Sequence, residues 1–86
     1  MITIYGKDGC IFCTKAIKFC QENNLVYSYI NLSEKHRRRE RMYYRSLGTD
    51  ILPLIEITTS KKILYGWNDN VKDEIINIEE AINEQT

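Results

Sequence analysis

Two cysteines near the start of the chain have the spacing that reversible thiol chemistry needs. Cys10 and Cys13 are separated by Ile11 and Phe12. Residues three apart on a helix lie on one face about a turn apart, so the two sulfur atoms can come within bonding distance. We therefore expect a cysteine pair that opens and closes as a disulfide without unfolding the chain.

The position of Cys10 predicts which cysteine attacks. Residues 2–5 read as a short strand, and a helical pattern begins at Ile11, so Cys10 stands at a helix start. Unpaired N–H groups and the helix dipole favour an anion there, and Lys7 adds a positive charge close in sequence. We expect a lowered pKa for Cys10 and the role of nucleophile. Cys13, further along the apolar side of the helix, should be buried and act as the resolving thiol.

The same cysteine spacing also occurs in zinc sites. A tetrahedral site would need two more ligands, and only Cys20 and His36 are available in this sequence. A pair that follows a strand and opens a helix favours redox chemistry, so we predict no metal site. Cys20 continues the apolar stripe of the helix and is expected to be a buried, inert thiol.

The rest of the sequence predicts a small α/β domain. Hydrophobic periodicity places strands at 2–5, 26–32, 53–57 and 62–65, and helices at 11–24, 33–47 and from Asn68 or Asp69 through Ile82. Ser33 is the predicted cap of the second helix and Gly48 its end. The helical crossover predicts a parallel strand pair, and the turn at 58–61 predicts a hairpin. The order is βαβαββα, a four-stranded mixed sheet flanked by helices in one domain spanning residues 1–86.

Composition narrows the classes of function. The chain has 86 residues, with 12 Lys and Arg against 12 Asp and Glu, so its overall field gives no reason to expect a nucleic-acid partner. The N-terminal residues lack a signal-peptide pattern, and no apolar run is long enough for a membrane span. Three cysteines suit a reducing compartment better than a secreted disulfide framework. We expect a cytoplasmic monomer that does not bind membranes.

Three segments of the chain resemble the glutaredoxin family. The segment YGKDGCIFC looks like the family's strand, loop and cysteine pair, the dipeptide Leu52-Pro53 matches its cis-proline position, and YGWNDNV is similar to its glycine-aspartate segment. The resemblance implies a thioredoxin-like fold with Pro53 cis beside the cysteines. It also implies thiol-disulfide oxidoreductase activity, with glutathione as the reductant and no bound cofactor.

The resemblance also implies a glutathione site and a class of partners. By analogy, Lys7 and a side chain of the second helix hold the glycyl carboxylate, with Arg37, Arg38 and Arg41 as candidates from that helix. The Leu52 backbone pairs with the cysteinyl unit. The full expected binding set is Lys7, Phe12, Leu52, Pro53, Gly66, Trp67, Asn68 and Asp69. The partners implied are glutathione and disulfide-containing proteins, ribonucleotide reductase among them.

Two departures from the family pattern keep alternatives open. Ile11 and Phe12 replace the usual Pro-Tyr between the cysteines, and Trp67 stands where a second glycine is usual. A large ring at that position favours, as one alternative, a glutaredoxin-like redoxin recharged by thioredoxin reductase, with Trp67 as an apolar wall for a protein substrate. The other alternative is a non-catalytic binding module that keeps the thioredoxin fold.

Overall fold

The order of helices and strands follows the predicted βαβαββα pattern. The structure is a computed structural model that describes the backbone of residues 1–84 and the side chains of residues 1–79. Its elements are β1 (Ile2–Gly6), α1 (Ile11–Glu22), β2 (Tyr27–Asn31), α2 (Arg38–Ser46), β3 (Leu54–Ile57), β4 (Lys62–Tyr65) and α3 (Asp69–Glu84). The side chain of Ile82, expected on the apolar stripe of the last helix, lies outside the described residues.

The four strands form one mixed sheet in the order β2-β1-β3-β4. Strand β1 pairs parallel with β2, with Ile4 opposite Tyr29, and antiparallel with β3, with Tyr5 opposite Leu54. The β1–β2 pair is parallel because α1 returns the chain to the same edge before β2 begins. The hairpin β3–β4 completes the sheet in antiparallel register. The predicted mixed sheet is therefore confirmed.

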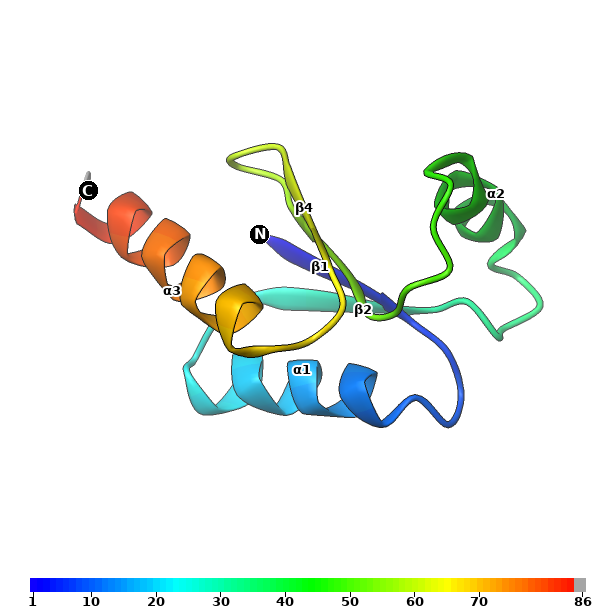
Figure 1. Cartoon of the computed structure of the whole chain (residues 1–86), viewed down its shortest axis with the longest axis horizontal. Helices are drawn as coiled ribbons and strands as arrows, with labels where there is room; N and C mark the ends of the chain where they lie inside the picture. The colour runs from blue at the N-terminus through cyan, green and yellow to red at the C-terminus, as the bar shows by residue number, and fades with distance from the viewer. Residues whose placement is uncertain (85–86) are drawn as a thin grey trace.

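Helices α1 and α3 cover one face of the sheet, where most of the core lies (Figure 1). Alternate strand residues point to this face, so Ile2 and Ile4 are both fully buried there. They meet Ala16 and Cys20 from α1 and Ile75 from α3. Cys20 is 1% exposed, which confirms that its sequence position belongs to the inward stripe of α1.

Helix α2 packs on the opposite face of the sheet and is less firmly buried. A second apolar cluster forms around Tyr5, Leu32 and Leu54, with Tyr44 and Leu47 packed against it. No residue of α2 is itself fully buried, so this helix is joined to the sheet by partly covered side chains only. Figure 1 shows α2 set apart from the other two helices.

The start of the second helix differs from the prediction. Helix α2 begins at Arg38, and Ser33 does not cap it. Residues 32–36 form turns instead, beginning with a bond from the Ser33 backbone N–H to Asn31 Oδ1 at 2.9 Å. The Ser33 hydroxyl accepts a hydrogen bond from the backbone N–H of Asp8 at 3.0 Å. The Ser33 hydroxyl is thus bonded to the loop after β1, five residues before α2 begins.

The other element ends agree closely with the sequence. Gly48 has a φ of 69° just after α2, as expected for a glycine that ends a helix. Asn68 caps α3, since its Oδ1 accepts a hydrogen bond from the Val71 N–H at 3.0 Å. Strand β1 continues one residue further than predicted, to Gly6. Among the described residues, no helix is both long enough and apolar enough to cross a bilayer.

Candidate active site

Cys10 and Cys13 form a disulfide at the start of α1. Cys10 is the N-cap residue of the helix, with φ of −85° and ψ of 103°, and its Sγ accepts a hydrogen bond from the Cys13 N–H at 3.2 Å. The two Cα atoms are 5.3 Å apart, within the range of natural disulfides. The sequence spacing therefore places the sulfurs together as predicted. A thiolate at Cys10 would occupy the position where a helix stabilises negative charge.

The two cysteines differ in their access to solvent. Cys10 is partly exposed, whereas Cys13 is 1% exposed and forms part of the helix face that packs on the sheet. A reagent or substrate can therefore approach the pair at Cys10, whereas Cys13 is enclosed by the protein. Among the described side chains, no group of three or more His, Cys, Asp or Glu residues is arranged to hold a metal ion.

Gly6, at the end of β1, lets the sheet approach the cysteine pair. A Cβ atom added to Gly6 would lie 2.8 Å from Cys13 Sγ and 2.8 Å from the hydroxyl oxygen of Tyr29. Such contacts are far inside van der Waals distance, so only glycine fits between these two side chains. Sequence reasoning missed Tyr29, because nothing in its type or spacing distinguishes it from the other strand tyrosines.

The loop between β1 and α1 is tied to the end of β2. The Asp8 carboxylate accepts a hydrogen bond from Asn31 Nδ2 at 2.7 Å, in addition to the bond from its backbone N–H to Ser33. The Cys10 N–H donates to the Lys7 carbonyl at 3.4 Å. These bonds fix the loop at both ends, so they set where α1 begins and where Cys10 is presented.

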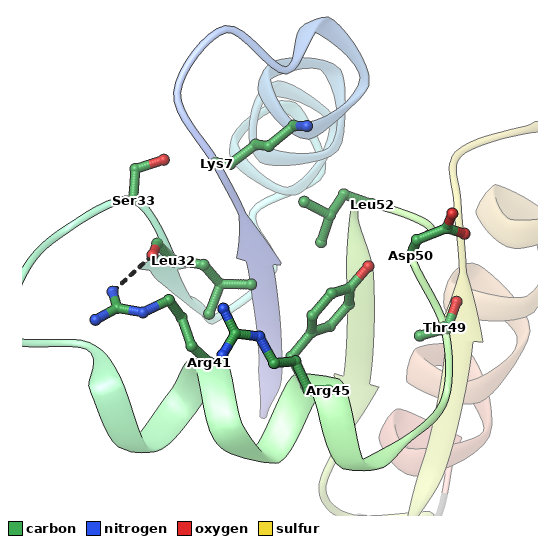
Figure 2. Close-up of a pocket in the computed structure, with 9 residues that line it drawn as sticks. Lys7, Leu32, Ser33, Arg41, Arg45, Thr49, Asp50 and Leu52 are labelled. Atoms are coloured by element: carbon green, nitrogen blue, oxygen red, sulfur yellow. Dashed lines mark hydrogen bonds between the residues drawn. The ribbon is translucent and has the colours of Figure 1, made fainter.

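A cavity of about 400 Å³ lies beside this loop (Figure 2). It brings together Lys7 and Leu52, two residues of the predicted binding set that are far apart in the sequence. Its other lining residues are Leu32, Ser33, Arg41, Tyr44, Arg45, Thr49 and Asp50. Figure 2 shows Lys7 and Arg45 on opposite sides of the cavity. With Arg41, three positive side chains line it, against one carboxylate, Asp50.

Arg41, one of the predicted ligand-binding arginines, is engaged with the protein's own backbone. Its guanidinium donates to the carbonyls of Leu32 at 2.9 Å, Glu34 at 2.6 Å and Lys35 at 3.3 Å. It therefore holds the turns between β2 and α2, and the bond to Leu32 is visible in Figure 2. A side chain with this many internal acceptors has few donors left for a ligand.

Arg45 is the arginine of α2 that remains available to the cavity. Arg37 forms ion pairs with Glu34 at 3.9 Å and Glu40 at 3.2 Å, and it does not line the cavity. Arg45 lines the cavity and has no hydrogen bond or ion pair to any side chain that the structure describes. Sequence reasoning missed Arg45, although its position one turn after Arg41 places it on the same face of the helix.

Pro53 and Gly66 are joined directly at the ends of β3 and β4. The Leu52-Pro53 peptide bond is cis, and Pro53 is almost fully buried. Its carbonyl accepts a hydrogen bond from the Gly66 N–H at 2.8 Å. Gly66 has a φ of 79°, a conformation that favours glycine, so these two members of the predicted set form one rigid corner.

Trp67 lies away from the cavity that Lys7 borders. Its ring packs edge-on against Phe19 of α1, with centroids 5.3 Å apart, and Lys72 Nζ lies 5.9 Å from its centroid. The ring borders a separate hollow on the α1 side that Lys15 also lines. Trp67 therefore does not fill the space between Lys7 and Leu52.

The remaining predicted residues lie at the surface. Phe12 is 52% exposed beside the disulfide, with Lys15 Nζ 5.5 Å from its ring centroid. Asn68 is engaged in capping α3, and the side chain of Asp69 is 96% exposed, 3.6 Å from Lys72. Neither Asn68 nor Asp69 lines the cavity, so the structure groups only part of the predicted set around it.

Comparison with protein families identifies a match over most of the chain. The family model described as Glutaredoxin matches residues 2–60, which include the cysteine pair and the Leu52-Pro53 dipeptide. No curated protein sequence is similar enough to count as a relative.

Solved structures with the same architecture include proteins of two kinds. A glutaredoxin from Archaeoglobus fulgidus superposes with a TM-score of 0.71 at 19% identity, covering 87% of this chain and 84% of its own. A thioredoxin-like protein gives 0.67 at 19% identity, covering 86% and 97%. Glutaredoxin 1 from Francisella tularensis gives 0.58 at 18% identity, covering 95% of both chains. The predicted thioredoxin-like fold is thereby confirmed.

Proposed function

This chain belongs to the glutaredoxin family, and on that premise we propose that it is a dithiol thiol-disulfide oxidoreductase that uses glutathione as its reductant. One observation carries the proposal. A partly exposed cysteine at a helix N-cap is bonded to a cysteine that is 1% exposed. This asymmetry gives one sulfur access to substrate and keeps the other in reserve.

The proposed reaction consists of two thiol-disulfide exchanges. The Cys10 thiolate attacks one sulfur of a substrate disulfide, a mixed disulfide forms, and the other substrate sulfur leaves as a thiolate. Cys13 then loses its proton and attacks Cys10 Sγ, which releases the second substrate thiolate and forms the Cys10–Cys13 disulfide. Two glutathione molecules, oxidised to glutathione disulfide, return the pair to the dithiol.

The cavity beside Lys7 supports glutathione as the reductant. Lys7 and Arg45 border it from two sides and supply positive charge for a peptide carboxylate. Leu52, directly before the cis bond, lines the same cavity. We propose disulfide-containing cytoplasmic proteins as substrates, including ribonucleotide reductase, and a protein that works as a monomer.

The test of the proposed function is turnover of a glutathione mixed disulfide. Wild-type protein is assayed with glutathione, glutathione reductase and NADPH, and NADPH consumption is followed. Cys10→Ser should abolish turnover, because it removes the attacking sulfur. Cys13→Ser should keep turnover of this small substrate and lose reduction of a protein disulfide. Cys20→Ser is the matched control, and turnover of Cys10→Ser equal to wild type would contradict the proposal.

A second reductant is worth a parallel assay because of the surface around Trp67. Phe19 and Trp67 form an aromatic pair beside Lys72, and Ile11 is 69% exposed next to the disulfide. Such a surface suits contact with a protein. A redoxin recharged by thioredoxin reductase would be reduced by that enzyme and NADPH without glutathione. A non-catalytic module would turn over a disulfide substrate with neither of these reducing systems.

A further inference from the structure

The buried sulfur of Cys13 has a hydroxyl group close to it. Cys13 Sγ and the Tyr29 hydroxyl oxygen are each 2.8 Å from the position that a Cβ atom of Gly6 would occupy. The two atoms therefore lie no further apart than twice that distance. Tyr29 comes from β2 and Cys13 from α1, so only the folded chain brings them together.

Cys13 needs a polar partner when it reacts. Only its thiolate can attack the mixed disulfide, and burial opposes the charged form of a thiol. Strands β1 and β2 contain no charged residue, and the buried residues of α1 beside Cys13 are also uncharged. A hydrogen-bond donor that reaches the sulfur would lower the cost of forming this thiolate.

Tyr29 is suited to donate such a bond. It is half-buried, and burial together with the charges of Asp8 and Glu34 raises the pKa of its phenol, so the O–H keeps its proton. Among the described residues, its hydroxyl has no hydrogen-bond partner. The hydroxyl of Tyr27, two residues earlier on the same face of β2, accepts a bond from Gln21 Nε2 at 3.0 Å.

We propose that the Tyr29 hydroxyl donates a hydrogen bond to the Cys13 sulfur as this thiolate forms and so accelerates the resolving step. The inference rests on the proposed dithiol function and assigns a residue to its second exchange. In that exchange Cys13 gives its proton to solvent base and bonds to Cys10 Sγ, and the leaving sulfur takes the electron pair of the broken bond. Tyr29 keeps its own proton throughout.

The resolving step can be followed without any physiological substrate. Reduced protein is mixed with 5,5′-dithiobis(2-nitrobenzoate) in a stopped-flow instrument. Attack by Cys10 releases one thionitrobenzoate at a rate that depends on reagent concentration. Attack by Cys13 releases a second at a rate independent of that concentration. Tyr29→Phe should slow the second phase about tenfold near neutral pH and raise its pH midpoint by about one unit, because a hydrogen bond to the charged form is lost.

Tyr27→Phe is the matched control, since it removes a hydroxyl from the same face of the same strand. It should leave the second phase and its pH midpoint unchanged, and Cys13→Ser should show the first phase only. Equal second-phase rates and midpoints in Tyr29→Phe and wild type would overturn the inference while leaving the dithiol function intact. Absence of the second phase in wild-type protein would instead overturn the dithiol function itself.

Discussion

Three cysteines in this chain occupy three different environments and so have different chemistry. Cys10 is partly exposed at a helix N-cap, Cys13 is buried one turn later, and Cys20 is buried two turns beyond that. All three lie on or next to one helix, so residue type alone does not separate them. The position of each sulfur relative to the helix end and the sheet decides its reactivity.

Cys20 should make the stability of the oxidised protein depend on alkaline pH. Burial, and then the charge of Glu79, raise the pKa of its thiol from 9.0 to about 11. Below pH 9 both folded and unfolded states keep the proton. As pH rises from 9 towards 11, the unfolded state loses it first, so the contribution of Cys20 to the free energy of unfolding falls, by up to about 2 kcal/mol.

Urea unfolding of wild type and Cys20→Ala at several pH values checks this prediction. The disulfide-bonded protein is used, because Cys10 and Cys13 then do not titrate. The difference in free energy of unfolding between the two proteins should be constant from pH 7 to 8.5 and should shrink from pH 9 to 11. A difference that stays constant to pH 11 would show that Cys20 is not protected from ionisation.

At the scale of the elements, the connection between β2 and α2 depends on one arginine. This segment leads from β2, at the edge of the sheet, to the face that α2 covers. Its carbonyls at Leu32, Glu34 and Lys35 have Arg41 as a common donor. Helix α2 itself has no side-chain cap and buries no residue fully. The wall of the cavity beside Lys7 is therefore held in place partly by a side chain that also lines it.

Arg41 and Arg45 should respond differently to truncation. Arg41→Ala leaves backbone carbonyls without their charged donor and should lower the free energy of unfolding by about 1–3 kcal/mol. Arg45→Ala should change stability by less than about 0.5 kcal/mol, because Arg45 is exposed. In the turnover assay, Arg45→Ala should instead raise the KM for glutathione several-fold.

Urea denaturation and steady-state kinetics on both variants separate these effects, with Arg38→Ala as the exposed control outside the cavity. Equal losses of stability for Arg41→Ala and Arg38→Ala would show that the three carbonyl contacts are not structural. An unchanged KM for Arg45→Ala would remove that arginine from the glutathione site.

At the scale of the whole molecule, charge is separated between two ends of a neutral protein. Helix α2 contains four arginines and one acidic residue, and α3 contains six acidic residues and one lysine. Figure 1 shows these helices at opposite ends of the molecule. The cavity lies at the basic end, since Arg41 and Arg45 line it. This arrangement favours the approach of anionic ligands to that end.

The fold as a whole should depend strongly on Ile75. This residue is fully buried and joins α3 to both β1 and β3 in the larger core cluster. Ile75→Ala should therefore lower the free energy of unfolding by about 2–5 kcal/mol through lost burial and a cavity. This loss is a large part of the whole free energy of unfolding expected for a domain of 86 residues.

Thermal unfolding followed by circular dichroism measures the effect of this change. Val26→Ala is the control, because Val26 is 73% exposed and its truncation should cost less than about 0.5 kcal/mol. A loss in Ile75→Ala no larger than in Val26→Ala would mean that α3 does not share the cooperative core.

The sequence by itself determined the element order, the mixed sheet and the cysteine pair. These features depend on residues that are close in the sequence. Apolar residues recur at every second position in strands and at every third or fourth position in helices. Caps such as Asn68 mark helix ends, and the two cysteines are three positions apart. Even so, the start of α2 was predicted at Ser33 and lies at Arg38, and the Ser33 hydroxyl is bonded to the loop after β1 instead. That contact joins residues 25 apart in the sequence.

Only the tertiary structure decided which side chains surround the cysteines and the cavity. Arg41 and Arg45 are alike in sequence, but the packing of α2 turns one to backbone carbonyls and leaves the other at the cavity. Tyr29 lies near the buried sulfur because β2 pairs with β1 at a register that places its ring beside Gly6. A hydrophobic pattern indicates which face of a strand is buried and so constrains its register. Which side chains of other elements the strand then meets depends on how those elements dock on the sheet.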